Sequence, residues 1–412
     1  VNAPATWVRP ELVAEIRFNS WTEGGYLRAP SFMRLREDKA PWQAGGIELV
    51  PERTGPESAS RAPYPGTVGE VLEQVQSGGE TLVLKVEGHS IPVNNLGKVL
   101  WPAEKGPRPL TKRDLLVYLA RVSPYLLPHL RDRPLTLSRF PNGIHGEQFF
   151  QKHWPDSLPA FVDTVDLYSE HKDSFQQYLI CDNLATLLWL GQIADLELHT
   201  WFSRTNPEPD MIEGLDRSPN EIVDYPDFII FDIDPYIYSG KEAGGAEPEL
   251  NREAFARTVQ VAGWLKEILD SFSLSAFIKT SGKTGLHVHV PIIRKLDFTA
   301  IRSIAGTIGR FLMRDHPREI TMEWTVEKRT GKVFFDHNQN SRGKTLSSIY
   351  SPRPAPDATV SMAVKWEELD RIYPTDFTIL NCPERLDETG DLWSDILEAK
   401  KDIQALLEAG SL

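Results

Sequence analysis

Cysteine is scarce in this 412-residue chain, which contains only Cys181 and Cys382. Two cysteines exclude a disulfide framework and fit a reducing compartment such as the cytosol. No apolar run approaches the roughly 18 residues that a membrane-spanning helix needs, so no membrane partner is expected. The chain opens Val1-Asn2-Ala3-Pro4, with neither an initiator methionine nor the start of a signal peptide. This start indicates an excised fragment or a processed end.

A positive net charge is also missing, because the formal net charge is −13. That total argues weakly against a nucleic-acid partner, but local patches matter more than the total. Residues 85–152 carry 11 Lys and Arg against 5 Asp and Glu, a balance of +6. Residues 383–412 carry 3 against 8, a balance of −5. The basic region therefore leaves room for a phosphate-rich partner.

Composition and periodicity predict a mixed α/β (α+β) protein with more than one unit. A Pro/Gly-rich linker, 43–80, is expected between an N-terminal segment, 1–42, and a main domain, 81–412. Helices are expected at about 111–127, with Thr111 as N-cap, and at 174–190, 251–271 and 391–408. Strands are expected at 14–18, 81–86, 134–139, 196–201, 227–233, 275–279, 285–292 and 332–336.

Two aspartates, Asp232 and Asp234, end an apolar stretch typical of a buried strand, 228–235. Residues i and i+2 of a strand share a face, so the two carboxylates converge. Like charges on an apolar strand are costly unless a cation neutralises them, and Mg²⁺ and Mn²⁺ prefer carboxylate oxygen. The pattern indicates a metal site, and a pair of turn or N-cap aspartates is the alternative.

A third acid, Asp336, ends another apolar strand at 332–336. Two acids on one strand and one on another form the minimal cage for two metals that flank a phosphoryl group. A strand-end aspartate is often purely structural, so Asp336 taken alone decides little.

Between these acids lies a small turn, Ser281-Gly282-Lys283-Thr284-Gly285. Its backbone N–H groups, hydroxyls and Lys283 can cradle phosphate oxygens. The first glycine of a Walker A motif is replaced by Phe277 and a strand follows the turn, which argues against an ATPase P-loop. His287 and His289 share a strand face beyond it, but the cysteines complete no recognisable zinc pattern.

Three further residues lie near these motifs in the sequence. His199 alternates with apolar residues on the strand at 196–201, where a satisfied core histidine is the usual interpretation. Lys344 and Arg353 follow Asp336 in a Ser/Pro-rich segment. They can pair with a triphosphate and would otherwise be ordinary surface charges.

Together these motifs resemble one family, the polymerase domain of the bacterial DNA-repair ligase D, in the archaeo-eukaryotic primase superfamily. The matching stretches occur in family order across roughly residues 85–380. They are Asn95 to Pro102, Leu127 to Leu137, Phe149 to Lys152, Phe231 to Pro235, Thr280 to Gly282, Gly285 to His287, and Asp336 with Gln339 and Asn340.

The resemblance implies two facing sheets, one similar to an RNA-recognition fold, with the active site between them. The implied activity is template-directed nucleotidyl transfer, which fills gaps and extends ends during repair by non-homologous end joining. One of two Mn²⁺ (or Mg²⁺) ions would activate the primer 3′-hydroxyl, and the other would stabilise the leaving pyrophosphate. A preference for ribonucleotides is implied as well.

The resemblance also assigns roles to individual residues. The implied metal ligands and catalytic residues are Asp232, Asp234 and Asp336. The implied nucleotide-binding residues are His199, Ser281, Lys283, Thr284, His287, Gln339, Lys344 and Arg353. Asn95, Lys98 and Lys112 would bind the 5′-phosphate across a DNA gap. Implied partners are DNA ends, gapped duplex, nucleoside triphosphates and Ku, in the bacterial cytoplasm at the nucleoid.

The first forty residues resemble the end of the OB domain of an ATP-dependent ligase, on three matching stretches: Trp7 to Glu15, Leu27 to Phe32 and Leu35 to Lys39. The adenylated-lysine motif Lys-x-Asp-Gly is absent, so ligation by this chain is not expected. A parent protein with the ligase ahead of the polymerase is implied.

One departure concerns the turn, where the family often has Thr-Ser-Gly-Ser-Lys-Gly. This chain has Lys283-Thr284 before Gly285, so the lysine is displaced by one residue. Either Lys283 reaches the phosphate from the neighbouring position or Thr284 replaces it.

The alternative functions are a de novo primase, a non-catalytic DNA-end-binding scaffold, and a metal-dependent phosphatase or nuclease.

Overall fold

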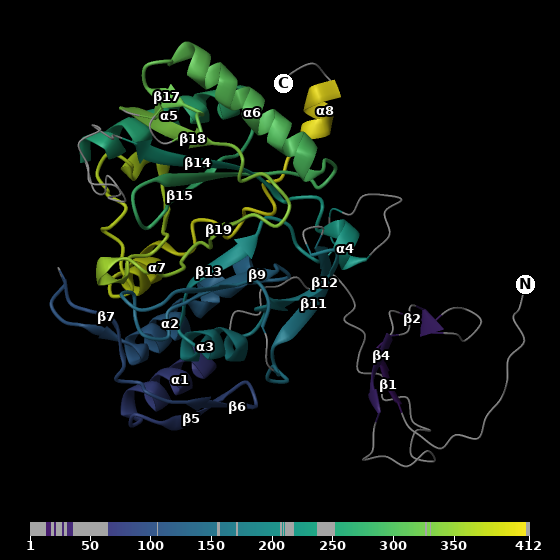
Figure 1. Cartoon of the computed structure of the whole chain (residues 1–412), viewed down its shortest axis with the longest axis vertical. Helices are drawn as coiled ribbons and strands as arrows, with labels where there is room; N and C mark the ends of the chain where they lie inside the picture. The colour runs from purple at the N-terminus through teal and green to yellow at the C-terminus, as the bar shows by residue number, and fades with distance from the viewer. Residues whose placement is uncertain are drawn as a thin grey trace, which may run out of the picture. The chain divides into compact units, whose positions relative to one another are not determined.

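The computed structural model describes residues 14–17, 20–21, 27–28 and 31–35 and most of the chain from 65 to 408. Within 65–408 the residues outside the description are 105, 155–156, 170–171, 207, 209, 211–217, 237–251, 326–327 and 330. The chain divides into two compact units, 1–60 and 61–412 (Figure 1). No helix among the described residues has the length and apolar character needed to cross a membrane.

The N-terminal unit contains two small antiparallel pairs of strands. β1 (Ala14–Arg17) pairs with β4 (Ser31–Leu35), and β2 (Ser20–Trp21) pairs with β3 (Leu27–Arg28). The strand predicted at 14–18 is therefore confirmed over its first four residues.

The predicted linker 43–80 was wrong over its second half, while residues 43–64 lie outside the described residues. A helix, α1 (Pro65–Ser77), forms there because Val71 and Val75, four residues apart, are buried in the core of the larger unit. The amide of Gln74 also pairs with the backbone of Lys85 on the next strand.

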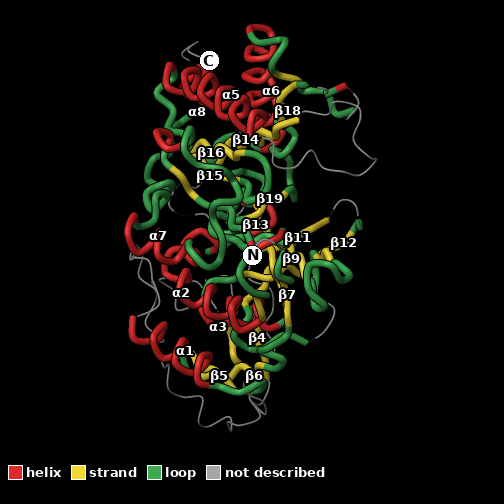
Figure 2. Tube along the Cα trace, turned by 90° about the vertical axis from the view of Figure 1, so that its left-hand side faces the viewer, coloured by secondary structure: helices red, strands yellow, loops and turns green. Residues whose placement is uncertain are grey.

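Two sheets form the framework of the larger unit. One has the order β10-β9-β13-β19 and the other β17-β18-β14-β16-β15-β20. Helices α5 and α6 cover the outer face of the six-stranded sheet, and α1, α2 and α3 lie on the far side of the four-stranded sheet (Figures 1 and 2). The predicted mixed α/β fold with two facing sheets is confirmed.

The strands of these sheets are β9 (Leu135–Arg139), β10 (Phe149–Gln151), β13 (Asp195–Trp201), β14 (Phe228–Tyr236), β15 (Phe277–Thr280), β16 (Leu286–Pro291), β17 (Ile320–Thr321), β18 (Lys332–Asp336), β19 (Thr345–Ser347) and β20 (Ala363–Val364). Three hairpin pairs accompany them: β5 (Leu82–Val86) with β6 (His89–Val93), β7 (Val99–Trp101) with β8 (Leu110–Thr111), and β11 (Asp163–Ser169) with β12 (Ser174–Ile180). The helices are α2 (Lys112–Leu130), α3 (Leu184–Gln192), α4 (Pro219–Ile222), α5 (Arg252–Ser271), α6 (Phe298–Asp315), α7 (Cys382–Thr389) and α8 (Ile403–Glu408), with 3₁₀ turns at Pro356–Ala358 and Trp366–Glu368.

Helix α2 begins where the sequence predicted, because Thr111 and Asp114 form a reciprocal capping box. Its predicted end near Pro128 was wrong, since the helix continues to Leu130. Leu126, Leu127 and Leu130 are buried, so packing of the last turn outweighs the backbone donor that proline lacks.

Two other helix predictions were also wrong. Residues 174–180 form β12, which pairs with β11 over seven residue pairs, and α3 starts only after the N-cap Asn183. Most of 391–408 forms turns, because the Asp391 carboxylate accepts hydrogen bonds from the Tyr350 hydroxyl and the Trp393 N–H. Helix α6, at 298–315, was not anticipated from the sequence.

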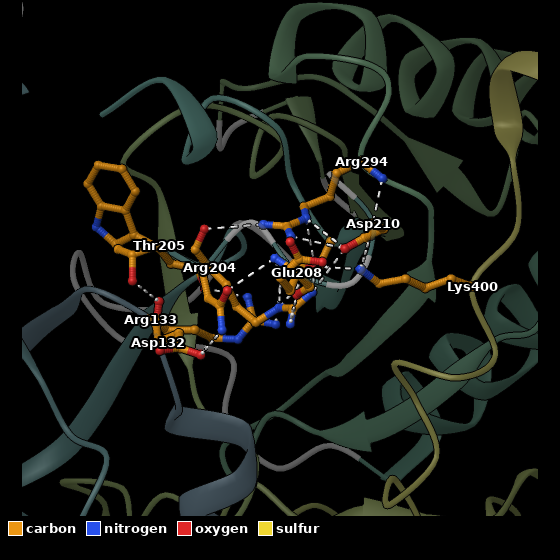
Figure 3. A network of polar contacts seen from close by, with 11 residues as sticks. Asp132, Arg133, Arg204, Thr205, Glu208, Asp210, Arg294 and Lys400 are labelled. Atoms are coloured by element: carbon orange, nitrogen blue, oxygen red, sulfur yellow. Dashed lines mark hydrogen bonds and ion pairs between the residues drawn. The ribbon is translucent and has the colours of Figure 1, made fainter. Parts of the chain in front are cut away.

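One buried carboxylate, Asp227, holds several of these segments together at the start of β14. Its oxygens lie 2.9 Å from Arg133 Nη2, 2.9 Å from Arg204 Nη2 and 2.6 Å from Lys400 Nζ. Asp210 joins the cluster through Arg204, Arg294 and Lys400, as Figure 3 shows. The network thus links the segments after α2, β13 and β16 to the C-terminal turns.

The electrostatics of Asp227 depend on these cations. Burial alone would raise the pKa of its carboxyl, but Arg204, Arg133, Lys400 and Arg294 outweigh burial and hold the pKa well below its usual range. The carboxylate is fully buried, so removing its charge leaves several cations without compensation in a low-dielectric setting.

We expect Asp227→Asn to lower the free energy of unfolding by about 3–5 kcal/mol, the usual cost of breaking a buried ion pair. Urea unfolding of both proteins measures the difference. Asp387→Asn is the control, because Asp387 is 61% exposed and pairs with Arg121 at 3.0 Å. It should change stability by less than about 1 kcal/mol. Equal losses in the two variants would contradict a special role for the buried cluster.

The stability difference between wild type and Asp227→Asn should depend on pH. The pKa of Asp227 is lower in the folded chain than its unfolded value of about 3.9, so its stabilisation is complete above that pH. The stability difference between wild type and Asp227→Asn should therefore stay constant from about pH 5 to 8 and shrink as pH falls below about 4.

Candidate active site

Four polar residues form one row across the six-stranded sheet. Asp336 on β18 is opposite Asp232 on β14, Asp232 is opposite His287 on β16, and His287 is opposite Lys279 on β15. Directly opposed residues in a sheet project to the same face. This face lies toward the four-stranded sheet, because Lys279 Nζ donates a hydrogen bond to the Ser347 carbonyl of β19 at 2.9 Å.

The predicted acids Asp232 and Asp336 meet in this row and are both buried. The amide nitrogen of Gln339 donates to Asp232 Oδ2 at 3.3 Å and to Asp336 Oδ2 at 3.2 Å. The other oxygen of Asp232 has no hydrogen-bond partner and lies 3.3 Å from His287 Nε2. Gln339 therefore bridges the two carboxylates from the loop that follows β18.

The pKa values reflect this crowding. Burial, followed by the charges of Asp234 and Asp336, raises the pKa of Asp232 well above its usual range. Burial, followed by Lys279 and Arg353, lowers the pKa of His287 well below its usual range, so the ring is neutral. A bound cation would reverse the balance at Asp232, and carboxylate oxygens are the donors that hard divalent ions prefer.

The third predicted acid, Asp234, lies two residues further along β14 and is half-buried. Gly285 approaches it closely, because a Cβ there would lie 2.7 Å from Asp234 Oδ1 and 2.5 Å from the Ile233 carbonyl. Among the described residues, no three His, Cys, Asp or Glu side chains are grouped so that they could hold a metal ion. The two-acid pair fits a cation, and a three-acid cage stays a prediction.

The predicted Ser-Gly turn follows β15 at the same edge of the site. Ser281 Oγ accepts hydrogen bonds from the backbone N–H groups of Lys283, Thr284 and Gly285 at 3.2, 3.1 and 2.9 Å. Gly282 has a φ of +73°, which a residue with a side chain rarely adopts. The Ser281 hydroxyl therefore shapes the turn and gathers its N–H groups.

Two of the predicted triphosphate contacts, Arg353 and His199, share one carboxylate. Glu197 Oε1 lies 2.7 Å from Arg353 Nε, and Glu197 Oε2 lies 3.3 Å from His199 Nε2. Neither contact has the alignment of a hydrogen bond, since Glu197 Oε1, His199 Nε2 and Arg353 Nε all lack a hydrogen-bond partner. Arg353 also donates to the Ser281 carbonyl at 2.7 Å, so it connects the turn to β13.

Glu197 keeps its charge although it is buried. Burial alone would raise the pKa of this carboxyl, but Arg353, His199 and Lys283 lower it to about 2. Lys283 is thus near this acid, whereas Lys344, just before β19, is exposed. Thr284 shows only the turn contact of its backbone.

Lys279, a buried lysine, ends the same row of polar residues on β15, next to His287. Its Nζ lies 2.8 Å from His287 Nδ1 and 2.5 Å from Ser361 Oγ. Burial, followed by Arg353, lowers its pKa well below the usual range. Lys279 thereby fixes the ring of His287, whose other nitrogen faces Asp232.

The three residues expected at a 5′-phosphate form a separate group near the start of α2. Lys112 Nζ donates to the carbonyls of Asn94 and Gln192 at 3.2 and 2.9 Å, and Lys98 Nζ donates to Asn142 Oδ1 at 2.8 Å. Burial, followed by the charge of Lys98, lowers the pKa of Lys112 to about 8. Asn95, with φ +54°, precedes Lys98 in the same loop. Two lysines without a carboxylate partner in the described chain make this group suited to an anion.

Sequence reasoning missed four residues of these two groups: Glu197, Lys279, Asn142 and Gln192. Glu197 was detectable, because it shares a strand face with His199 two residues later. Lys279 carried the weaker signal of a charge inside an apolar strand. Asn142 and Gln192 gave no signal, since they reach the lysines from distant positions, Asn142 from the loop after β9 and Gln192 from the end of α3.

Two family models match parts of this chain. The family model of the LigD primase-polymerase domain matches residues 111–393, and that of the C-terminal region of ATP-dependent DNA ligases matches residues 1–39. The bifunctional non-homologous end joining protein LigD of Bacillus subtilis is 29% identical over 78% of this chain and 48% of that protein. The multifunctional LigD of Pseudomonas aeruginosa is 28% identical over 97% of this chain and 42% of that protein.

A solved structure is also similar: the polymerase domain of Mycobacterium tuberculosis ligase D in complex with DNA. The TM-score is 0.62 at 28% identity, covering 76% of this chain and 99% of that one. The chain spans less than half the length of the two LigD proteins named above.

We expect Glu197→Gln to lower the free energy of unfolding by about 3 kcal/mol, because Arg353 then keeps a buried charge without its acid. Glu384→Gln is the matched control: Glu384 is 57% exposed and lies 2.6 Å from Arg121. That variant should lose less than about 1 kcal/mol. Chemical denaturation measures both, and a negligible loss for Glu197→Gln would show that the pair is not coupled to the fold.

Proposed function

The chain belongs to the LigD primase-polymerase domain family, and from this membership we propose that it adds nucleotides to DNA ends. The proposed reaction is template-directed transfer from NTP or dNTP to a primer 3′-hydroxyl, in gaps and at broken ends, during non-homologous end joining. DNA, nucleoside triphosphates and Ku are the proposed partners.

One observation carries this proposal. Four buried polar atoms without a hydrogen-bond partner, Asp232 Oδ1, Glu197 Oε1, His199 Nε2 and Arg353 Nε, come from the two facing sheets and their connections. Buried polar atoms normally have partners, so such a group indicates that ligands complete the site. The nitrogens of His199 and Arg353 suit phosphate oxygens, and Asp232 Oδ1 suits a cation, whereas Glu197 Oε1 already lies beside Arg353.

In the proposed site Asp232, Asp336 and Asp234 would hold two divalent ions, Mn²⁺ or Mg²⁺. Bound there, these ions would lower the pKa of the attacking hydroxyl and neutralise charge on the transferred phosphoryl group. Arg353 and His199 would bind the triphosphate, with the N–H groups of the Ser281 turn and Lys283 beside them. Glu197 would keep Arg353 and His199 in place, and Lys279 would orient His287. Positioning therefore supplies most of the catalysis.

The second group, Asn95, Lys98 and Lys112, would bind the 5′-phosphate on the far side of a gap. This role explains why two lysines lie together with only neutral partners. The N-terminal segment, which matches the ligase C-terminal region, would belong to a ligase that precedes the polymerase in a longer protein.

We expect Asp232→Asn to reduce nucleotide addition by about 10²–10³-fold or more, because the site loses its central anion. Folding should be spared, since the raised pKa of Asp232 shows that its ionised form is costly in the fold. Primer extension with Mn²⁺ measures the activity, and unfolding and DNA binding are measured beside it. Primer extension by this variant at the wild-type rate would contradict a catalytic role for Asp232. Release of nucleotides from DNA instead of incorporation would indicate a nuclease.

We expect Lys98→Gln with Lys112→Gln to abolish any preference for gaps that carry a 5′-phosphate, while affinity for unphosphorylated gaps changes little. In the wild type this preference should weaken as pH rises above about 8, because unbound Lys112 loses its proton there. Titrations of phosphorylated and unphosphorylated gapped DNA at pH 7 and 9 give both results. Equal losses on the two substrates would contradict the pocket.

A further inference from the structure

Two arginines of α6, Arg302 and Arg310, lie near His337, the residue that follows Asp336. Arg302 donates a hydrogen bond to Asn338 Oδ1, and Arg310 donates to Thr307 Oγ1 at 2.8 Å on its own helix. Gly306 lies between them with little room to spare, because a Cβ there would be 3.0 Å from the His337 ring and 3.3 Å from Arg310 Nη1. Both guanidinium groups therefore lie close enough to His337 to act on its charge.

These arginines lack acidic partners within the part of the chain that the structure describes. Both are exposed, and neither forms an ion pair with a described carboxylate. The surrounding segment 298–318 carries four arginines and one acid, Asp315, in a chain whose net charge is −13. That acid pairs with Arg314, at 2.8 Å. The surface formed by Arg302, His337 and Arg310, here called the α6 cationic surface, thus carries uncompensated positive charge.

The α6 cationic surface adjoins the proposed active site. The Asn338 N–H donates to Asp336 Oδ1 at 2.7 Å, and the next residue, Gln339, contacts both acids. The loop after β18 therefore reaches the acid pair through Gln339 and the α6 cationic surface through Asn338. In addition, His337 Nδ1 is buried and has no hydrogen-bond partner.

We propose that Arg302 and Arg310 bind backbone phosphates of the nucleic-acid strand as it leaves the acid pair. This inference rests on the proposed function, and it adds a contact for the DNA backbone on α6, outside the space between the sheets. The occupant is a phosphodiester backbone, because guanidinium groups without acid partners match repeated phosphates and read no base. The contact should therefore be independent of DNA sequence.

The test is binding of a fluorescein-labelled primer–template duplex to the whole chain, with chelator and without nucleotide. We expect Arg302→Gln with Arg310→Gln to weaken binding about tenfold at ~0.1 M salt. The slope of log K against log salt should become shallower by about 2, one for each lost phosphate contact. The loss should be the same for duplexes of different sequence.

Arg314→Gln is the control, because it removes one positive charge from the same helix at a residue that has an acidic partner. Arg314 is already paired with Asp315 and lies over the ring of Phe311 at 4.9 Å, so affinity should change less than about twofold. An equal loss in this control would overturn the inference, because any charge on the helix would then suffice. Unchanged affinity and slope in the double variant would overturn it as well.

The outcome is separable from that of the proposed function. If wild type extends primers and the double variant binds DNA like wild type, the inference fails and the function stands. If wild type does not extend primers but DNA binding depends on Arg302 and Arg310, the function fails and the inference stands. Loss of affinity for a polyglutamate peptide with unchanged DNA binding would assign the surface to an acidic protein and overturn the inference.

Discussion

The buried charge of Asp227 is the constraint on which the arrangement of the larger unit depends. Asp227 lies immediately before β14, the strand that carries Asp232 and Asp234, and its cations come from the segments after α2, β13 and β16. Its backbone joins the same segments, because its N–H donates to the Phe202 carbonyl and its carbonyl accepts from Ile292. The cluster therefore fixes where β14 starts relative to the four-stranded sheet. A shift of one residue there would turn the acids to the opposite face of the sheet.

The layer between the sheets follows from that fixed spacing. Each sheet contributes polar groups that the other needs: Lys279 bonds to the β19 carbonyl of Ser347, and Arg353 spans from Glu197 on β13 to the Ser281 turn. Burying these charges costs free energy that their mutual pairing offsets only in part. The partly satisfied groups are the ones that the proposed triphosphate and metal ions would complete.

The sequence predicted the features that local interactions determine, and it missed those that depend on distant partners. The acid strands 227–233 and 332–336, the cap at Thr111 and the turn at Ser281 follow from local periodicity and local hydrogen bonds, and they were found. The helix expected at 174–190 failed, because a strand partner at 163–169 decides the conformation and local propensity does not record it. Likewise Asn142 and Gln192 reach Lys98 and Lys112 from distant positions, which no spacing in the sequence could indicate.

The partner of each cation indicates whether its charge stabilises the fold or is available to a ligand. Arg133, Arg204 and Lys400 have buried carboxylate partners, so their charges are already used to hold the segments together. Lys98, Lys112, Arg302 and Arg310 contact only neutral acceptors among the described residues. A phosphate can pair with this second set without breaking an ion pair, whereas pairing with the first set would dismantle the core. An acidic chain can thus present phosphate sites, because its acids pair with the cations of the Asp227 cluster and leave this second set of cations without acid partners.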